Sequence, residues 1–281
     1  MSRAGLAALL LALVSAPLYA GDQLNTALLK FKEGEFEKAH DLAAKVPEDD
    51  PDFARARYLM GEIWLLLGDP GEAQDALLAA LRKKPNSEPI LTTLGRSLLA
   101  QNQDENALAF LKRAVTADKK SARANAFYGI ALLRSSGGKK GGKQIAAALK
   151  LGPGDPLATQ AIVLHYIRAN DLAAAKKVAG GFSRKNKEHA MGPFLEGLIL
   201  ERQRSFDAAI KAYEKALKRD TKFVDAHKNL AILCIAQNPG YRDRERTGKA
   251  MKHFKSYFEL GGKDPAVRRI YDTLKSFLAN R

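Results

Sequence analysis

Apolar positions along the chain follow the spacing of amphipathic helices, and small apolar residues return at a step of 34 residues. The clearest row of small residues consists of Gly61, Gly95, Gly129 and Gly197, with Val163 at the slot that the row skips. A second row consists of Ala39, Ala73, Ala107, Gly141, Ala175 and Ala209. A third row, at the ends of units, consists of Pro51, Pro85 and Pro153. Three rows at one period predict a stack of repeated helical hairpins.

Two stretches carry this pattern most fully. Residues 54–87 place small and large side chains at Gly61, Trp64, Gly68, Ala73, Leu77, Ala80, Leu81 and Pro85. Residues 190–222 do so at Gly197, Phe206, Ala209, Tyr213, Ala216 and Leu217. On these residues both stretches resemble tetratricopeptide repeats, in which each unit is a pair of antiparallel helices. The resemblance implies an all-α, right-handed superhelical solenoid of about seven hairpins, and the abundance of Ala and Leu favours helix throughout.

The register divides the mature chain, residues 21–281, into one array. The units lie near residues 20–53, 54–87, 88–121, 122–155, 156–189, 190–223 and 224–264. In the last unit the step from Ala231 to Ala250 is seven residues too long, which indicates an insert at about 237–248. Residues 265–281 are amphipathic and predict a capping helix, since the end of a stack must cover its apolar face.

Small residues let two crossing helices approach closely. We therefore expect the first helix of a unit to meet the second at the pairs Gly61 with Ala73, Gly95 with Ala107, and Gly197 with Ala209. The fifth unit departs from this pattern, because Val163 fills its glycine slot and Gly180 and Gly181 replace the end of its second helix. We expect residues 180–193 to form the loosest joint of the array.

The first twenty residues, MSRAGLAALLLALVSAPLYA, have a basic start, a short apolar run and small residues at the end. This arrangement is typical of a cleaved secretory signal peptide, residues 1–20. Cys234 is the only cysteine, so no internal disulfide can form, and its apolar neighbours predict a place in the core. We expect an exported protein of the bacterial periplasm or cell envelope.

Residues 137–143, GGKKGGK, have the glycine and lysine spacing of a phosphate-binding P-loop. Gln144 stands where that motif needs a hydroxyl, and the preceding residues follow a helical pattern where a strand is required. We therefore expect no nucleotide. Glycine disfavours helix, so the second helix of this unit should start late and leave a mobile cationic segment from 136 to about 142. A weak anion site is the most that we expect of Lys139, Lys140 and Lys143.

Candidate catalytic and metal-binding groups do not form a recognisable pattern. The five histidines lack the HExxH spacing, and the single cysteine excludes paired Cys ligands. We expect no metal, no cofactor and no enzymatic activity.

Binding is the more promising function. The resemblance implies that the first helices line a concave face, which in this family holds extended peptides or helical segments. Carried across the units, the register gives the candidate partner-binding residues Tyr58, Glu62, Arg96, Phe127, Ile130, Arg134, Gln160, Leu164, Arg168, Phe194, Leu198, Arg202 and Lys228. This apolar floor with a series of arginines favours an interaction scaffold that contacts apolar and acidic groups of other proteins.

The formal net charge of +15 keeps an alternative open. A basic surface attracts polyanions, so the loop lysines could hold an anionic membrane surface, a cell-wall polymer or nucleic acid. Export argues against nucleic acid as the normal partner. The sequence leaves the oligomeric state open.

Overall fold

The computed structural model describes residues 22–138 and 140–279, and every regular element within them is a helix. Six consecutive pairs are α2 (Asp22–Glu33) with α3 (Phe36–Ala44), α4 (Phe53–Leu67) with α5 (Pro70–Lys83), α6 (Glu88–Ala100) with α7 (Asp104–Ala117), α8 (Ala122–Ser135) with α9 (Gly142–Leu151), α10 (Pro156–Arg168) with α11 (Leu172–Lys185), and α12 (Met191–Arg202) with α13 (Phe206–Arg219). The last elements are α14 (Val224–Ala236), the short 3-10 helix η1 (Pro239–Tyr241), α15 (Arg244–Glu259) and α16 (Pro265–Ala279). The all-α repeat fold expected from the sequence is confirmed.

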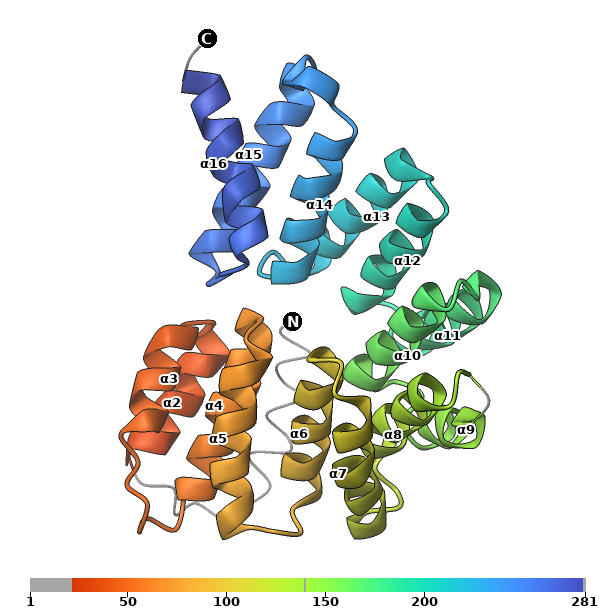
Figure 1. The fold of residues 1–281 in the computed structure, drawn as a ribbon. Coiled ribbons are helices and arrows are strands. Elements are labelled where there is room, and N and C mark those ends of the chain that lie inside the picture. The colour runs from red at the N-terminus through yellow and green to blue at the C-terminus, as the bar shows by residue number, and fades with distance from the viewer. Residues whose placement is uncertain (1–21, 139, 280–281) are drawn as a thin grey trace.

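The hairpins follow one another around a superhelical array, and the last hairpin returns toward the first (Figure 1). Two contacts join these ends. Lys222 Nζ donates to the carbonyl oxygen of Glu33 at 3.3 Å, and Lys263 Nζ lies 2.8 Å from Glu37 Oε1. The inner face of the array, formed by the first helices, therefore lies inside a nearly closed turn.

Within a hairpin, the glycine of the first helix makes room for a large side chain of the second. A Cβ added to Gly61 would lie 2.5 Å from Leu77 Cγ. The same relation holds for Gly95 with Leu111, Gly129 with Ile145, and Gly197 with Tyr213. A Cβ at these glycines would thus first meet the large residue one turn beyond the alanine of the second helix. The expected alanine partners Ala73, Ala107 and Ala209 are buried, and their contact with the glycines stays a prediction.

The hairpin of α10 and α11 exchanges the sizes at these two slots. Val163 stands in the glycine slot of α10, and Ala179 stands in the large slot of α11. Both side chains are buried. The second helix continues through Gly180 and Gly181 and ends at Lys185, so the expected break at these glycines does not occur.

The link between α8 and α9 has the late helix start that its glycines predict. α9 begins at Gly142, and the backbone φ is positive at Gly137, Gly138 and Gly141. A Cβ on Gly141 would lie 2.2 Å from the carbonyl oxygen of Gly129, so glycine is required at this close approach. The delay of the helix is confirmed, whereas the mobility of the segment stays a prediction.

The longer link of the last hairpin is partly helical. Residues 237–243 join α14 to α15 through η1, and the Asn238 side chain holds this link. Asn238 Nδ2 donates to the Asp243 carbonyl at 2.8 Å, and its Oδ1 accepts from the Asp243 N–H at 2.9 Å. Residues 244–248, which the sequence placed in the insert, form the first turn of α15.

Cys234 lies in the core of α14, as its apolar neighbours indicated. Burial raises the pKa of its thiol to about 11, so the group is protonated at neutral pH and is a poor nucleophile. Among the helices that the structure describes, none has both the length and the apolar character needed to cross a membrane. The signal peptide expected at residues 1–20 lies outside the described residues.

Candidate partner-binding groove

A groove with a cavity of about 230 Å³ lies on the inner face of the array, between α6, α8 and α10. Its lining residues are Arg96, Leu99, Ala100, Phe127, Ile130, Arg134, Leu157, Gln160, Ala161, Leu164 and Arg168. Seven of the residues chosen from the sequence meet here: Arg96, Phe127, Ile130, Arg134, Gln160, Leu164 and Arg168. The repeat register thus brings three first helices to one surface.

Local sequence fixes where these helices begin, and therefore which side chains reach the groove. Ser121 accepts the N–H of Ala124 at the start of α8, and Asp155 accepts the N–H of Ala158 at the start of α10. Pro156 occupies the first turn of α10, where its missing N–H costs nothing. Such caps set the helical phase, so a step of 34 residues returns to the same face.

Two of the groove arginines are already paired within the array. Arg96 Nη2 lies 3.0 Å from Glu62 Oε2, and Arg134 Nη2 lies 2.7 Å from Asp104 Oδ1. Arg134 also donates to the carbonyl oxygen of Leu99 at 2.9 Å. These contacts join neighbouring hairpins, so both arginines stabilise the stack as well as line the groove.

Arg168 differs from the other two groove arginines. It is exposed at the end of α10 and forms no ion pair with any residue that the structure describes. No acidic residue lines the groove. The groove therefore combines an apolar floor with one guanidinium that is available to an acidic partner group.

Other predicted site residues lie in the core. Glu62 is 1% exposed, and its Oε1 accepts the hydroxyl of Thr93 at 2.7 Å. Tyr58 is buried, and burial raises the pKa of its phenol well above the ordinary range. Phe194 is buried against Tyr213 and Phe223, with ring centroids 5.7 Å and 4.6 Å away. In this conformation a partner reaches none of these three residues.

The remaining predicted residues lie further along the array. Leu198 is half-buried and Arg202 exposed on α12, and neither lines the groove. Lys228 on α14 lies 3.9 Å from Asp225 within its own helix. The structure thus separates the predicted surface into the groove and outlying positions beyond α10.

Sequence reasoning missed the small or terminal residues of the groove. Ala100 and Ala161 were not predicted because their side chains are small and uncharged, although each stands at the repeat position of a predicted residue, Arg134 and Phe127 respectively. Leu157 lies in the first turn of α10, beyond the positions that the register selected. The repeat step alone was enough to find the two alanines.

The groove continues into a second cavity of about 180 Å³ toward the ends of the array. The two cavities share Arg96, Leu157 and Gln160. Val224 of α14 and Phe36 of α3 also line the second cavity. The first and last hairpins thus enclose one end of the inner face.

The weak anion site expected at the loop lysines stays a prediction. Lys140 and Lys143 are exposed, and Lys139 lies outside the described residues. The glycine-rich segment joins α8 to α9, and no strand precedes it or occurs elsewhere in residues 22–138 and 140–279. The segment therefore lacks the strand–loop–helix context in which backbone amides converge on a phosphate.

Two histidines, His227 of α14 and His253 of α15, lie in contact between these helices. Their Nδ1 atoms lie 2.8 Å apart, and His227 Nε2 lies 2.9 Å from the carbonyl oxygen of Thr221. Since Nε2 of His227 must then donate, its Nδ1 accepts the proton of His253 Nδ1. Burial lowers the pKa of both rings, that of His253 to about 4. Within the described part of the chain no cluster of three or more His, Cys, Asp or Glu could hold a metal ion.

Comparison with known families agrees with this architecture. Tetratricopeptide repeat models match residues 30–96, 64–131, 160–222 and 194–238, which together span more than half of the sequence. The chain belongs to the tetratricopeptide repeat family. No curated protein is similar enough in sequence to count as a match.

Solved structures share the fold at low sequence identity. A tetratricopeptide repeat protein from Parabacteroides merdae ATCC 43184 has a TM-score of 0.56 at 11% identity, over 90% of this chain and 98% of that chain. A chain of the APC/C hetero-tetramer Cut9-Hcn1 has a TM-score of 0.53 at 15% identity, over 91% of this chain but only 49% of its own length. PilW, a widely conserved type IV pilus biogenesis factor, has a TM-score of 0.52 at 19% identity, over 71% and 94%.

Proposed function

We propose that this protein is a non-catalytic adaptor that binds a peptide or helical segment of another protein in the groove between α6, α8 and α10. One observation carries the proposal: three first helices gather apolar side chains and an unpaired arginine on one open surface. Tetratricopeptide repeat proteins are in general interaction modules, so the fold supports the same class of function.

The size of the groove favours anchor side chains of a protein segment. Its cavity of about 230 Å³ lies below the range of about 300–1,000 Å³ that is usual for enclosed small-molecule sites. Leu157 and Leu164, both half-buried, offer apolar surface to one or two partner side chains, as in helix-in-groove recognition. Arg168 would then meet an acidic side chain next to these anchors.

The setting that we propose is the bacterial cell envelope. The support is the signal-peptide pattern of residues 1–20 together with the lack of any internal disulfide. PilW, which is similar in fold, is a type IV pilus biogenesis factor. Fractionation of cells that produce the full-length chain, with N-terminal sequencing of the mature protein, tests this part of the proposal.

A charge and shape change in the groove tests the binding site. The mature protein serves as bait for envelope proteins, and the recovered partner is divided into overlapping peptides whose affinity is measured by calorimetry. The double variant Leu164→Glu, Arg168→Glu should weaken the best peptide at least about tenfold, because it places two carboxylates against the apolar anchor and its acidic neighbour.

Lys211→Glu provides the matched control, since Lys211 is exposed on α13 and does not line the groove. It should leave the affinity within about twofold. Equal binding by the groove variant and the control would overturn the assignment of the groove.

A further inference from the structure

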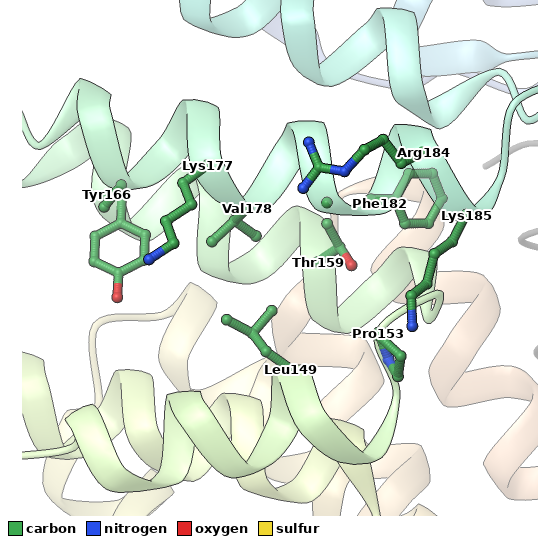
Figure 2. A pocket seen from close by; sticks show the side chains of 11 residues that line it. Leu149, Pro153, Thr159, Tyr166, Lys177, Val178, Phe182, Arg184 and Lys185 are labelled. Carbon is green, nitrogen blue, oxygen red and sulfur yellow. The ribbon is translucent and has the colours of Figure 1, made fainter.

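A further cavity, of about 480 Å³, lies on the other side of α10, between that helix, α9 and α11. We call it the slot. α10 presents Gln160 and Leu164 to the groove, whereas Thr159 and Tyr166 of the same helix line the slot. Figure 2 shows Leu149 of α9 and Val178 of α11 pointing toward one another across the slot. The slot is therefore separate from the proposed protein-binding surface.

The slot exists because the hairpins on its two sides pack incompletely. α9 makes little contact with α10, whereas α5 with α6 and α7 with α8 pack closely. Leu149 is only half-buried, although Leu81 and Leu217, which stand at the equivalent repeat position in other units, are buried. Gly181 adds no side chain on the α11 side, where the nearest atom to an added Cβ would be Arg184 Nη2 at 4.0 Å. The open volume is thus a property of this joint.

The lining of the slot has an apolar floor and a cationic rim. Leu149, Pro153, Val178 and Phe182 supply apolar surface. The cations of the rim are Lys177, Arg184 and Lys185, all exposed, and they form no ion pair with any residue of the described ranges. None of the lining residues is acidic. In the view of Figure 2, Lys177 and Lys185 lie at opposite ends of the slot, and Arg184 lies above it.

We propose that the slot binds a long-chain carboxylate, with the aliphatic chain between α9 and α11 and the carboxylate at the cationic rim. The volume lies in the range of about 300–1,000 Å³ that is usual for small-molecule sites. Guanidinium and ammonium groups bind carboxylates by charge-assisted hydrogen bonds, and apolar walls favour methylene groups. The ligand is thus defined by two features, a single aliphatic chain and one anionic head.

The walls of the slot disfavour a peptide as the occupant. Peptide backbone needs hydrogen-bond partners wherever it leaves water, and helical walls have already used their own N–H and C=O groups. The uncharged polar side chains of the lining are Thr159 and Tyr166. Thr159 Oγ1 already donates to the carbonyl oxygen of Asp155 at 2.7 Å. An aliphatic chain needs no such partners.

The rim cations also have a structural explanation, which the test must separate from binding. Arg184 and Lys185 lie in the last turn of α11, where cations complement the helix dipole. The helix α13 carries cations at the equivalent repeat positions, one unit further on: Lys211 for Lys177, Lys218 for Arg184 and Arg219 for Lys185. These three residues of α13 do not line the slot. These residues of α13 therefore offer controls of equal charge and helical position.

Calorimetry with monomeric octanoate, dodecanoate and dodecan-1-ol tests the chemistry of the ligand on the mature protein. Each buried methylene should add about fourfold in affinity, so the four extra methylenes of dodecanoate should tighten binding by up to about 250-fold over octanoate. Dodecan-1-ol, which lacks the charge, should bind at least about tenfold more weakly than dodecanoate. Equal binding of the alcohol and the carboxylate would overturn the assignment of the rim.

Paired glycine variants test the location. Gly181→Leu should fill the slot and reduce dodecanoate binding at least tenfold, whereas Gly180→Leu should retain it, since Gly180 lies outside the slot lining and lines the cavity toward α12. Both changes remove a helical glycine from α11, and an added Cβ meets only the end of the flexible Arg184 side chain, at 3.5 Å for Gly180 and 4.0 Å for Gly181, so both variants should fold. Circular dichroism and thermal melting check this before binding is compared.

Charge variants complete the test. Lys177→Glu with Arg184→Glu should weaken dodecanoate at least tenfold, whereas Lys211→Glu with Lys218→Glu, at the equivalent positions of α13, should change it less than twofold. Equal losses in both double variants would show attraction by net charge only and would overturn the slot. Displacement of dodecanoate by an acidic, apolar peptide, lost in Gly181→Leu, would assign the slot to a protein segment and would overturn the fatty carboxylate.

Discussion

The hairpin of α4 and α5 and the hairpin of α10 and α11 solve the same packing problem in opposite ways. In the first, Gly61 of α4 makes room for Leu77 of α5. In the second, Val163 of α10 is large and Ala179 of α11 is small. The first helix can therefore supply the bulk that the second helix gives up. The comparison indicates that the repeat requires a certain combined side-chain volume at these two positions, whichever helix supplies the larger side chain.

Further replacements in α11 accompany this exchange. α11 also carries Phe182 where α5 has Ala80, and Ser183 where α5 has Leu81. Phe182 is buried beside the slot, and Ser183 lines a cavity of about 390 Å³ toward α12. Cavities thus lie on both sides of α11, while the groove on the inner face keeps the regular register.

The largest effect is expected from removal of the bulk in the regular hairpin. Leu77→Ala should lower the free energy of unfolding by about 2–5 kcal/mol, because the buried leucine that fills the space beside Gly61 is lost. Urea denaturation followed by circular dichroism measures this loss. Leu29→Ala is the control, since Leu29 is 52% exposed, and its cost should stay below about 1 kcal/mol. Equal costs at both positions would contradict the packing role of Leu77.

A transplant of the α10–α11 pair tests the exchange directly. Gly61→Val alone should cost about 1–3 kcal/mol, because its Cβ would lie 2.5 Å from Leu77 Cγ. Combined with Leu77→Ala, it recreates the Val163 and Ala179 pair, and the double variant should recover about 0.5–3 kcal/mol relative to the sum of the single changes. Strictly additive changes in the free energy of unfolding, measured in the same denaturation assay, would show that the side chains at positions 61 and 77 do not fill a common space.

Glycine to alanine changes should have opposite signs in the two hairpins. Gly180→Ala should stabilise by about 0.5–1 kcal/mol, because Gly180 is helical and an added Cβ meets only Arg184 Nη1 at 3.5 Å. Gly61→Ala should destabilise, because its Cβ overlaps Leu77. Thermal melting of both variants gives the signs. Stabilisation by both would break the comparison.

Sequence was enough to predict the helical pairs and most of the groove, since both depend on a period that a single chain displays. It paired Gly61 with Ala73, whereas a Cβ at Gly61 would first meet Leu77, one helical turn further along α5. It also placed Glu62 on the surface, whereas the ion pair with Arg96 allows that carboxylate to be buried.

The slot was beyond prediction for a different reason. It depends on the spacing between α9 and α10, which follows from three helices at once and has no signal at any one position. The sequence drew attention to residues 180–193 through their glycines, and these glycines do lie beside the two cavities of α11. Their effect on the backbone was overestimated, since tertiary packing keeps the helix intact through both glycines.

The smallest expected effect concerns the joint that follows each hairpin. The position before the first helix of a unit is held by Ser87, Ser121 and Asp155, and before α12 by His189. His189 Nδ1 accepts the N–H of Met191 at 3.0 Å. Burial is the main cause that lowers the pKa of His189. The folded state therefore favours the neutral ring, and stability that is complete above the unfolded pKa of about 6.5 is lost as the pH falls through the window below it.

His189→Asn keeps a hydrogen-bond acceptor at this position and removes the titratable imidazole. The difference in unfolding free energy between pH 8 and pH 5 should therefore shrink by about 0.5 kcal/mol or less, after allowance for solvent screening at a half-exposed ring. The other histidines with lowered pKa remain in both proteins, so their contribution cancels. An unchanged pH dependence would show that the joint after α11 tolerates a charged ring. The α4–α5 and α10–α11 hairpins would then differ only in how their volumes pack.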